Sequence, residues 1–307
     1  MGLLVNGEWK DQWYDMAKSK GKFVREDSHF RNHITTDGST PFAPESGRYH
    51  LYVSYACPWA NRALIFRKIK KLESHISVSV VDYFMGENGW EFSDKYPEHL
   101  YQSNYMHQIY TKANPSYTGR VTEPVLWDKK NKTIVNNESS EIIRMLNSEF
   151  NDLGDTSIDM YPKEIRTEID VINTSIYSAI NNGVYKCGFA TTQDAYDEAI
   201  DALFSCLDEL DIRLENKQYL VNNQLTEADW RLFVTLVRFD AVYVTHFKCN
   251  VRRIMDYPNL SEYVKRLYNY PGVKETIHFD HIKNHYFKSH KTINPYGIVP
   301  KGPTELF

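Results

Sequence analysis

Residues 49–73 read YHLYVSYACPWANRALIFRKIKKLE, and this stretch decides the fold. Its first six residues are rich in types that favour β-strands. Cys57 and Pro58 then open a segment with apolar residues at helical spacing and cations in its last turn, which predicts a helix that begins with proline. Residues 76–81, ISVSVV, predict a second strand. Strand, helix and strand in this order predict a βαβ unit with a parallel pair of strands.

The α/β pattern continues beyond this unit. Residues 84–119 form a long insertion rich in glycine and aromatic residues, and loops of this length are usually functional or mobile. Residues 121–127 predict a strand entered through a proline, and residues 133–135 predict a further strand. Residues 138–150 have the pattern of a helix.

From residue 160 onward the pattern is helical. Residues 194–215 place one isoleucine and four leucines on one face at helical spacing. Thr226 and Asp229 have the spacing of a capping box at a helix start. Residues 258–270 predict another helix, which a Pro-Gly pair ends.

These patterns predict an α/β domain followed by an all-α domain. We expect three parts: an extended N-terminal arm over 1–48, the α/β domain over 49–152, and over 160–307 the helical domain with an irregular C-terminal tail.

Composition excludes several function classes. The net charge is −4, and Lys and Arg are scattered among acids, which argues against nucleic acid as a partner. No apolar run approaches the roughly 18 residues that span a bilayer, and the N-terminus does not read as a signal peptide. The four cysteines contain no CxxC pair, which suits a reducing compartment. We therefore expect a cytoplasmic protein that contacts neither nucleic acid nor membrane.

No metal site is expected. The nearest approach to a metal-ligand spacing is HFDH at residues 278–281, which we interpret as a solvated segment.

Cys57 is the candidate nucleophile. A thiol at a helix N-terminus faces free backbone N–H groups, here those of Trp59 and Ala60, and the positive end of the helix dipole. Both favour the thiolate and lower the thiol pKa below the roughly 8.5 of free cysteine. The alternative is an ordinary helix cap or a small buried residue. The position favours reactivity, because α/β sheets bind ligands at the carboxyl ends of parallel strands.

The resolving thiol is expected to come from outside the protein. A redox dithiol would carry a second cysteine three residues after Cys57, but Ala60 stands there. A disulfide formed at Cys57 must then be resolved by a small soluble thiol.

Several long segments carry a family resemblance. They are SYACPWANRALIFRKIKKLE (54–73), EPVLWDKKNKTIVNNESSEIIRMLN (123–147), NNGVYKCGFA (181–190), DWRLFVTLVRFDAVYVTHFKCN (229–250) and HYFKSHKTINPYGIVP (285–300). The chain resembles the cytosolic glutathione S-transferases, whose first domain is thioredoxin-like and whose second is all-α. It resembles most closely the glutathionyl-hydroquinone reductases, the Xi class, which is related to the Omega class. The resemblance runs from about residue 40 to residue 301.

The resemblance implies a reaction. Cys57 takes the glutathionyl group from a glutathionyl-hydroquinone as a mixed disulfide, and a second glutathione then leaves as oxidised glutathione. Glutathione is thus a co-substrate, no metal takes part, and the protein is a homodimer. Two alternatives stay open: an Omega-like thiol transferase or dehydroascorbate reductase, and a non-catalytic interaction module.

The resemblance also implies the glutathione-binding residues, which are Trp90, Arg120, Val121, Thr122, Glu123, Glu138 and Ser139. Pro124 matches the cis proline of the thioredoxin fold, which turns the preceding backbone toward the ligand. The residue before that proline is commonly apolar in such proteins, and here it is Glu123. If only its backbone contacts glutathione the change is harmless; if its side chain enters the site, affinity falls.

Three tyrosines, Tyr185, Tyr243 and Tyr286, match catalytic residues of the family. There the first is thought to move protons for the substrate, and the other two to lower the thiol pKa. Among 22 tyrosines any one is by default structural, but a phenol suits this chemistry because it donates a proton and packs against an aromatic ring.

The other three cysteines are interpreted as structural. Cys206 falls on an amphipathic helix and is expected in the core, whereas Cys187 and Cys249 are expected to be partly exposed.

Overall fold

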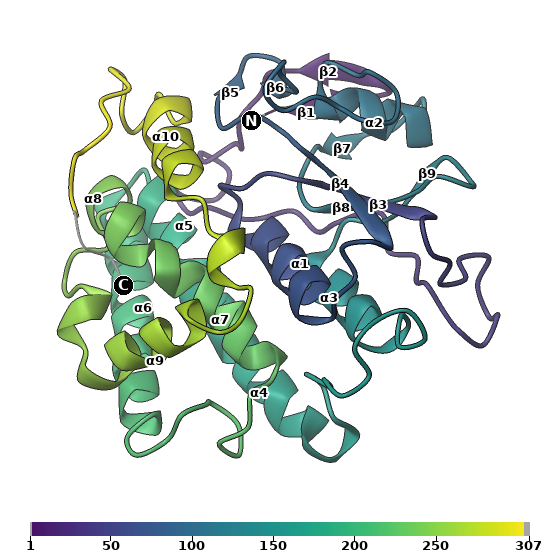
Figure 1. Cartoon of the computed structure of the whole chain (residues 1–307). Coiled ribbons are helices and arrows are strands. Elements are labelled where there is room, and N and C mark those ends of the chain that lie inside the picture. The colour runs from purple at the N-terminus through teal and green to yellow at the C-terminus, as the bar shows by residue number, and fades with distance from the viewer. Residues whose placement is uncertain (1, 304–307) are drawn as a thin grey trace. The chain divides into compact units, whose positions relative to one another are not determined.

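The computed structural model describes residues 2–303, which divide into two compact units. The first unit holds residues 2–13, 26–158 and 275–285; the second holds residues 14–25, 159–274 and 286–303. A mixed sheet with helices makes up most of the first unit, and helices make up the second (Figure 1).

The first unit is built around a four-stranded sheet with the strand order β4-β3-β8-β9. Strands β3 and β4 are parallel, and β8 is antiparallel to both of its neighbours. Helix α1 (Pro58–Ile69) joins the parallel pair and packs beside α3 (Ser139–Ser148). The strands are β3 (Tyr49–Val53), β4 (Ile76–Val80), β8 (Val125–Asp128) and β9 (Thr133–Asn136). This confirms the predicted βαβ unit and the thioredoxin-like arrangement of the first domain.

Strand β8 is shorter than the sequence indicated. It begins at Val125 instead of Val121. Pro124 has no N–H to give to a sheet ladder. The backbone N–H of Thr122 donates to the Tyr110 hydroxyl, and the Thr122 carbonyl accepts from it, so these groups are used outside the sheet.

The N-terminal arm is not wholly extended. Strands β1 (Leu3–Val5) and β2 (Glu8–Lys10) pair as a hairpin, and β1 also pairs with β7 (Gly119–Arg120). Asn6 and Gly7 form its two-residue turn with φ of 49° and 81°, the conformation that Asn-Gly turns favour. The Asn-Gly pair was a signal in the sequence that our prediction missed.

The insertion over 84–119 is also not an irregular loop. It forms a short hairpin of β5 (Met85–Gly86) and β6 (Gly89–Trp90), followed by helix α2 (Met106–Ala113). Met106, Ile109 and Tyr110 are fully buried in the hydrophobic core that the first unit builds around Tyr52 and Trp127. Their spacing of three and four residues is the helical signal that the aromatic richness of the segment obscured.

The second unit is helical, as predicted. Its principal helices are α4 (Arg166–Ile176), α5 (Gly183–Phe189), α6 (Gln193–Arg213), α7 (Glu227–Arg238), α8 (Val244–His246) and α9 (Pro258–Tyr268). Two π-helical turns, η2 (Tyr177–Asn181) and η3 (Phe239–Tyr243), follow α4 and α7. The first seven residues of helix α10 (Phe279–Ser289) belong to the first unit, and the remaining residues belong to the second. The short 3₁₀ turns are η1 (Lys163–Ile165), η4 (Ile254–Asp256) and η5 (Lys274–Thr276).

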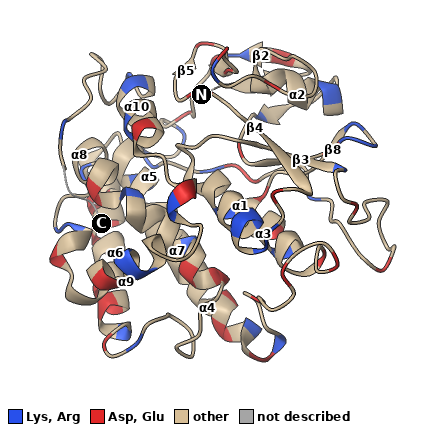
Figure 2. Ribbon diagram, in the orientation of Figure 1, with Lys and Arg blue, Asp and Glu red and all other residues tan. Residues whose placement is uncertain are grey.

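Charges of both signs are interspersed along the helices (Figure 2). Helices α4 and α9, for example, each carry charges of both signs. Within residues 2–303, no helix has the length and apolar character needed to cross a membrane.

The predicted capping box at the start of α7 is confirmed, and Asp229 is its centre. One carboxylate oxygen accepts from the N–H and hydroxyl of Thr226, and the other accepts from Leu220 N–H and the Tyr263 hydroxyl. Asp229 is fully buried, so its removal leaves these donors without an acceptor.

We expect Asp229→Ala to lower the free energy of unfolding by about 3 kcal/mol, since a helix cap and several buried hydrogen bonds are lost together. Asp229→Asn keeps one acceptor oxygen and should lose less. Urea unfolding followed by circular dichroism measures both changes. The exposed Asp201→Ala, on the neighbouring helix α6, is the matched control and should stay within about 0.5 kcal/mol of wild type. Equal stabilities of the Asp229 and Asp201 variants would contradict this assignment.

Candidate functional site

Cys57 stands at the N-terminus of α1, between the end of β3 and Pro58. Its backbone is extended, with φ −73° and ψ 121°, and its Sγ accepts the backbone N–H of Ala60 at 3.4 Å. The side chain is only partly buried. Pro58 has no N–H, so the amide that stabilises the thiolate is that of Ala60, two residues after Pro58. The structure thus gives Cys57 the helix-start environment that the sequence indicated.

The segment before β8 lies against this sulfur. The Cys57 thiol donates to the backbone carbonyl of Glu123 at 3.6 Å, and the Glu123–Pro124 peptide bond is cis. Val121 is buried, and Thr122 is held through its backbone by the Tyr110 hydroxyl. The segment around Glu123 is therefore fixed beside the thiol.

Tyr110 organises this segment and was not among the residues singled out from the sequence. Its hydroxyl donates to the Thr122 carbonyl at 2.9 Å and accepts from the Asn137 side chain at 3.0 Å. Asn137 immediately precedes Glu138, so Tyr110 links the segment before β8 to the start of α3. Its position on an apolar helical face was the only signal in the sequence, and that signal does not distinguish a core residue from a site residue.

Glu138 and Ser139 lie at the start of α3. The Glu138 carboxylate caps the helix by accepting the N–H of Ser140 at 3.0 Å and its hydroxyl at 2.8 Å. Ser139 is buried, and its hydroxyl accepts from Arg62 of α1 at 3.4 Å. The arrangement unites a helix N-terminus, a hydroxyl and a carboxylate, which suits a ligand that carries both a carboxylate and an ammonium group.

Arg120 and Trp90 are buried and engaged within the first unit. Arg120 donates to the Gln12 carbonyl and pairs with Glu26 at 3.4 Å. The Trp90 ring stacks on His285, with 4.6 Å between ring centroids. No described contact joins either side chain to Cys57, whereas the Glu123 carbonyl accepts from its thiol.

The three tyrosines predicted from the second half of the chain form one cluster. The Tyr286 hydroxyl lies 2.6 Å from that of Tyr185 and 3.1 Å from that of Tyr243. Tyr243 and Tyr286 are buried, whereas Tyr185 is half-buried with Arg25 above its ring. Burial raises the pKa of Tyr243 and of Tyr286 well above that of free tyrosine, so both keep their protons. The cluster is a chain of phenols that is partly accessible at Tyr185.

Residues 278–281 are only partly solvated, which corrects our interpretation: Asp280 is exposed, whereas His281 is buried. The His278 ring stacks on Tyr55 with 3.7 Å between centroids, and His281 is buried with its Nε2 2.8 Å from the Tyr96 hydroxyl. Phe279 begins helix α10, and the face of this helix that carries His281 is buried. This explains why the segment is less solvated than we predicted. Among residues 2–303, no group of His, Cys, Asp and Glu side chains could hold a metal ion.

Cys206 is buried, as predicted, and its sulfur lies 3.6 Å from the Ser175 hydroxyl. Cys187 and Cys249 are buried as well, which corrects the expectation of partial exposure. The backbone N–H of Cys249 donates to the Tyr243 carbonyl, and burial raises the pKa of the Cys249 thiol. Cys57 is thus the most accessible of the four thiols.

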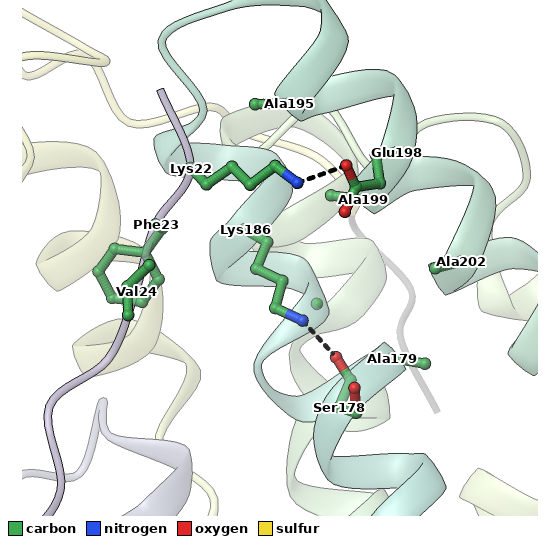
Figure 3. Close-up of a pocket in the computed structure, with 11 residues that line it drawn as sticks. Lys22, Phe23, Val24, Ser178, Ala179, Lys186, Ala195, Glu198, Ala199 and Ala202 are labelled. Carbon is green, nitrogen blue, oxygen red and sulfur yellow. Dashed lines mark hydrogen bonds and ion pairs between the residues drawn. The ribbon is translucent and has the colours of Figure 1, made fainter. Parts of the chain in front are cut away.

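A cavity of about 350 Å³ in the second unit does not involve the predicted residues. Two lysines stand at it, Lys22 paired with Glu198 at 2.6 Å and Lys186 donating to the Ser178 carbonyl at 3.1 Å (Figure 3). Alanines of α6 and the π-helical turn supply much of the remaining lining. Each ammonium group thus already has a protein partner.

Comparisons with known proteins agree with this arrangement. Two family models match, "Glutathione S-transferase, N-terminal domain" over residues 56–149 and "Glutathione S-transferase, C-terminal domain" over residues 193–266.

Three relatives are similar over almost the whole chain. The glutathionyl-hydroquinone reductase YqjG of Escherichia coli is 56% identical to this chain, and the match covers 99% of this chain and 95% of YqjG. The glutathionyl-hydroquinone reductase PcpF of Sphingobium chlorophenolicum is 54% identical, and the match covers 99% of this chain and 97% of PcpF. The glutathione-bound structure of YqjG superposes with a TM-score of 0.90 over 98% of this chain and 96% of that one, at 53% identity. The structure of the glutathione S-transferase Xi of Phanerochaete chrysosporium superposes with a TM-score of 0.89 at 54% identity, over 92% of this chain and 98% of that one.

Proposed function

The chain belongs to the glutathionyl-hydroquinone reductases, the Xi class of the glutathione transferases, and we propose that it reduces glutathionyl-hydroquinones through a mixed disulfide at Cys57. The observation that carries this proposal is the thiol itself. Cys57 stands at a helix N-terminus with the Ala60 amide on its sulfur, and no second cysteine stands three residues on. Such a thiol can form a disulfide but needs an external thiol to release it.

The proposed reaction balances in two steps. The Cys57 thiolate attacks the glutathionyl sulfur, the bond from that sulfur to the aromatic carbon breaks, and the carbon keeps the electron pair and takes a proton. The products are hydroquinone and a Cys57–glutathione disulfide. The thiolate of a second glutathione then attacks the glutathionyl sulfur of this disulfide, which releases oxidised glutathione and restores the Cys57 thiolate.

Glutathione is assigned to the groups around Cys57 and the start of α3. The backbone of Glu123 is proposed to pair with its cysteinyl part, and Glu138 and Ser139 with the ammonium and carboxylate of its γ-glutamyl part. The buried Ser139 hydroxyl and the α3 amides support this assignment. Trp90, Arg120, Val121 and Thr122 complete the proposed site.

The tyrosine cluster is assigned the proton transfers. Tyr185 is proposed to give the proton that the aromatic carbon takes, and Tyr243 and Tyr286 to hold and orient its hydroxyl. The hydroxyl distances of 2.6 and 3.1 Å along the chain support this division, because Tyr286 bonds to both of the others. We further propose a homodimer in the cytoplasm, where the free thiols remain reduced.

The test is product formation from a synthetic glutathionyl-hydroquinone and glutathione. We expect one oxidised glutathione for each hydroquinone released, measured by chromatography and by a coupled assay with glutathione reductase. Release of hydroquinone without oxidised glutathione would contradict the mechanism. A protein that binds glutathione but turns over neither this substrate nor a small disulfide would be a non-catalytic module, whereas turnover of the disulfide alone would identify a thiol transferase.

A further inference from the structure

Glu123 has a buried carboxyl group that the proposed reaction does not use. The residue is 5% exposed, and neither carboxylate oxygen has a hydrogen-bond partner of normal geometry among the described residues. The backbone of Ser54, just after the end of β3, favours the charged form, but its effect is smaller than that of burial. A buried carboxylate without a partner is unfavourable, and such groups usually take up a proton instead.

The groups that face this carboxyl do not offset a negative charge. The Tyr110 phenol of α2 interacts electrostatically with this carboxyl, and the Cys57 thiol at the start of α1 bonds to the backbone carbonyl of the same residue. The Tyr110 proton is already donated to the Thr122 carbonyl. No cation is among the described groups that act on Glu123, and its burial raises the pKa of its carboxyl well above the ordinary range of glutamate.

Cys57 and Glu123 are coupled by their position. The thiol donates to the Glu123 backbone carbonyl at 3.6 Å, so the carboxyl of that same residue lies within a few bond lengths of the sulfur's acceptor. The thiol and the carboxyl are thus linked through one backbone carbonyl, and negative charge on both would be mutually unfavourable. The Cys57 reaction needs the thiolate, and the site then favours the carboxyl that keeps its proton.

We propose that Glu123 is a positioning residue for the chemistry of Cys57, with a carboxyl that stays uncharged while the thiolate works and whose ionisation opposes that thiolate. The inference rests on the proposed function, since it takes Cys57 as the nucleophile. It assigns the Glu123 side chain a defined protonation state, and not only a place in the glutathione site. At alkaline pH the ionised carboxylate would also repel the thiolate of the incoming second glutathione.

Infrared difference spectroscopy on the full chain tests this directly. The spectrum of wild type minus Glu123→Gln isolates the carboxylic acid C=O band of Glu123, and Glu123→Val gives a second reference if the amide variant folds poorly. We expect the band at neutral pH and its loss on alkaline titration. In a Cys57→Ala background, the pH midpoint at which this band is lost should be lower by about one pH unit, a tenfold change in proton affinity, because the opposing thiolate is gone.

Cys206→Ala is the matched control, since it removes a thiol that is buried in the second unit, and its midpoint should equal that of wild type. A missing carboxylic acid band at neutral pH, or equal midpoints with and without Cys57, would overturn the inference. The spectra contain no substrate, so they are independent of turnover. Failure of the reductase assay with a shifted midpoint would reject the proposed function alone, and normal turnover with an unshifted midpoint would reject this inference alone.

Discussion

Replacing Cys57 by serine is expected to abolish reduction of a glutathionyl-hydroquinone, with kcat/KM lowered by at least ~10³-fold, as for the loss of other covalent nucleophiles. The hydroxyl keeps the helix-cap geometry at Pro58, because serine is itself a good N-cap residue. It cannot form the disulfide, so the first step has no product. A serine hydroxyl can still hydrogen-bond a glutathione thiolate, and we expect weak conjugation of glutathione to an electrophile in its place.

Mass spectrometry distinguishes this nucleophilic role from a structural one. After incubation with the glutathionyl-hydroquinone alone, wild type should carry a single glutathionyl adduct at Cys57, which added glutathione removes. Cys57→Ser and Cys57→Ala should carry none. Cys206→Ala is the matched control and should form the adduct as wild type does, since its thiol is buried. Equal reduction rates in wild type and Cys57→Ser would refute the mechanism.

The sequence was sufficient for the parts of the fold that local signals encode. Strand β3, helix α1 and strand β4 each have their own pattern of residue types, and their order dictates the parallel pairing. The capping box of Thr226 and Asp229 is equally local. Helix α2 was missed because it lies in a segment rich in aromatic residues and its apolar face is short, although that face is part of the core.

The site was only partly predictable, for a related reason. Cys57 was identified from the residues around it, which set its helix-start environment. The role of Tyr110 depends on contacts with residues 12 and 27 positions away, and the environment of the Glu123 carboxyl depends on Ser54 and Tyr110, which are also distant in the sequence. Nothing in the local pattern encodes such distant contacts. The resemblance supplied the three tyrosines, but not the hydrogen-bonded chain that they form.

Tyr185→Phe is expected to lower the rate of hydroquinone formation by about 10²-fold, the contribution of a positioned general acid. Tyr185 is the least buried of the cluster, and its hydroxyl lies 2.6 Å from that of Tyr286. The buried phenols of Tyr243 and Tyr286 keep their protons because burial raises the pKa of each. Tyr286→Phe should also slow the reaction, since Tyr286 bonds to both of the others. Tyr243→Phe should have the smallest effect, because its hydroxyl bonds to Tyr286 at the longer distance of 3.1 Å.

The two half-reactions separate this role from packing. Breakage of the carbon–sulfur bond needs a proton for the aromatic carbon, whereas attack of glutathione on the mixed disulfide needs none. In single-turnover experiments Tyr185→Phe should therefore slow hydroquinone release and leave the release of oxidised glutathione from preformed mixed disulfide within about threefold of wild type. Tyr196→Phe is the matched control, because it loses one hydroxyl bond, to the Lys248 carbonyl at 2.7 Å, outside the cluster. If Tyr185→Phe slowed both steps equally, Tyr185 would be acting on the sulfur or on packing, and the proton for the aromatic carbon would have to come from elsewhere.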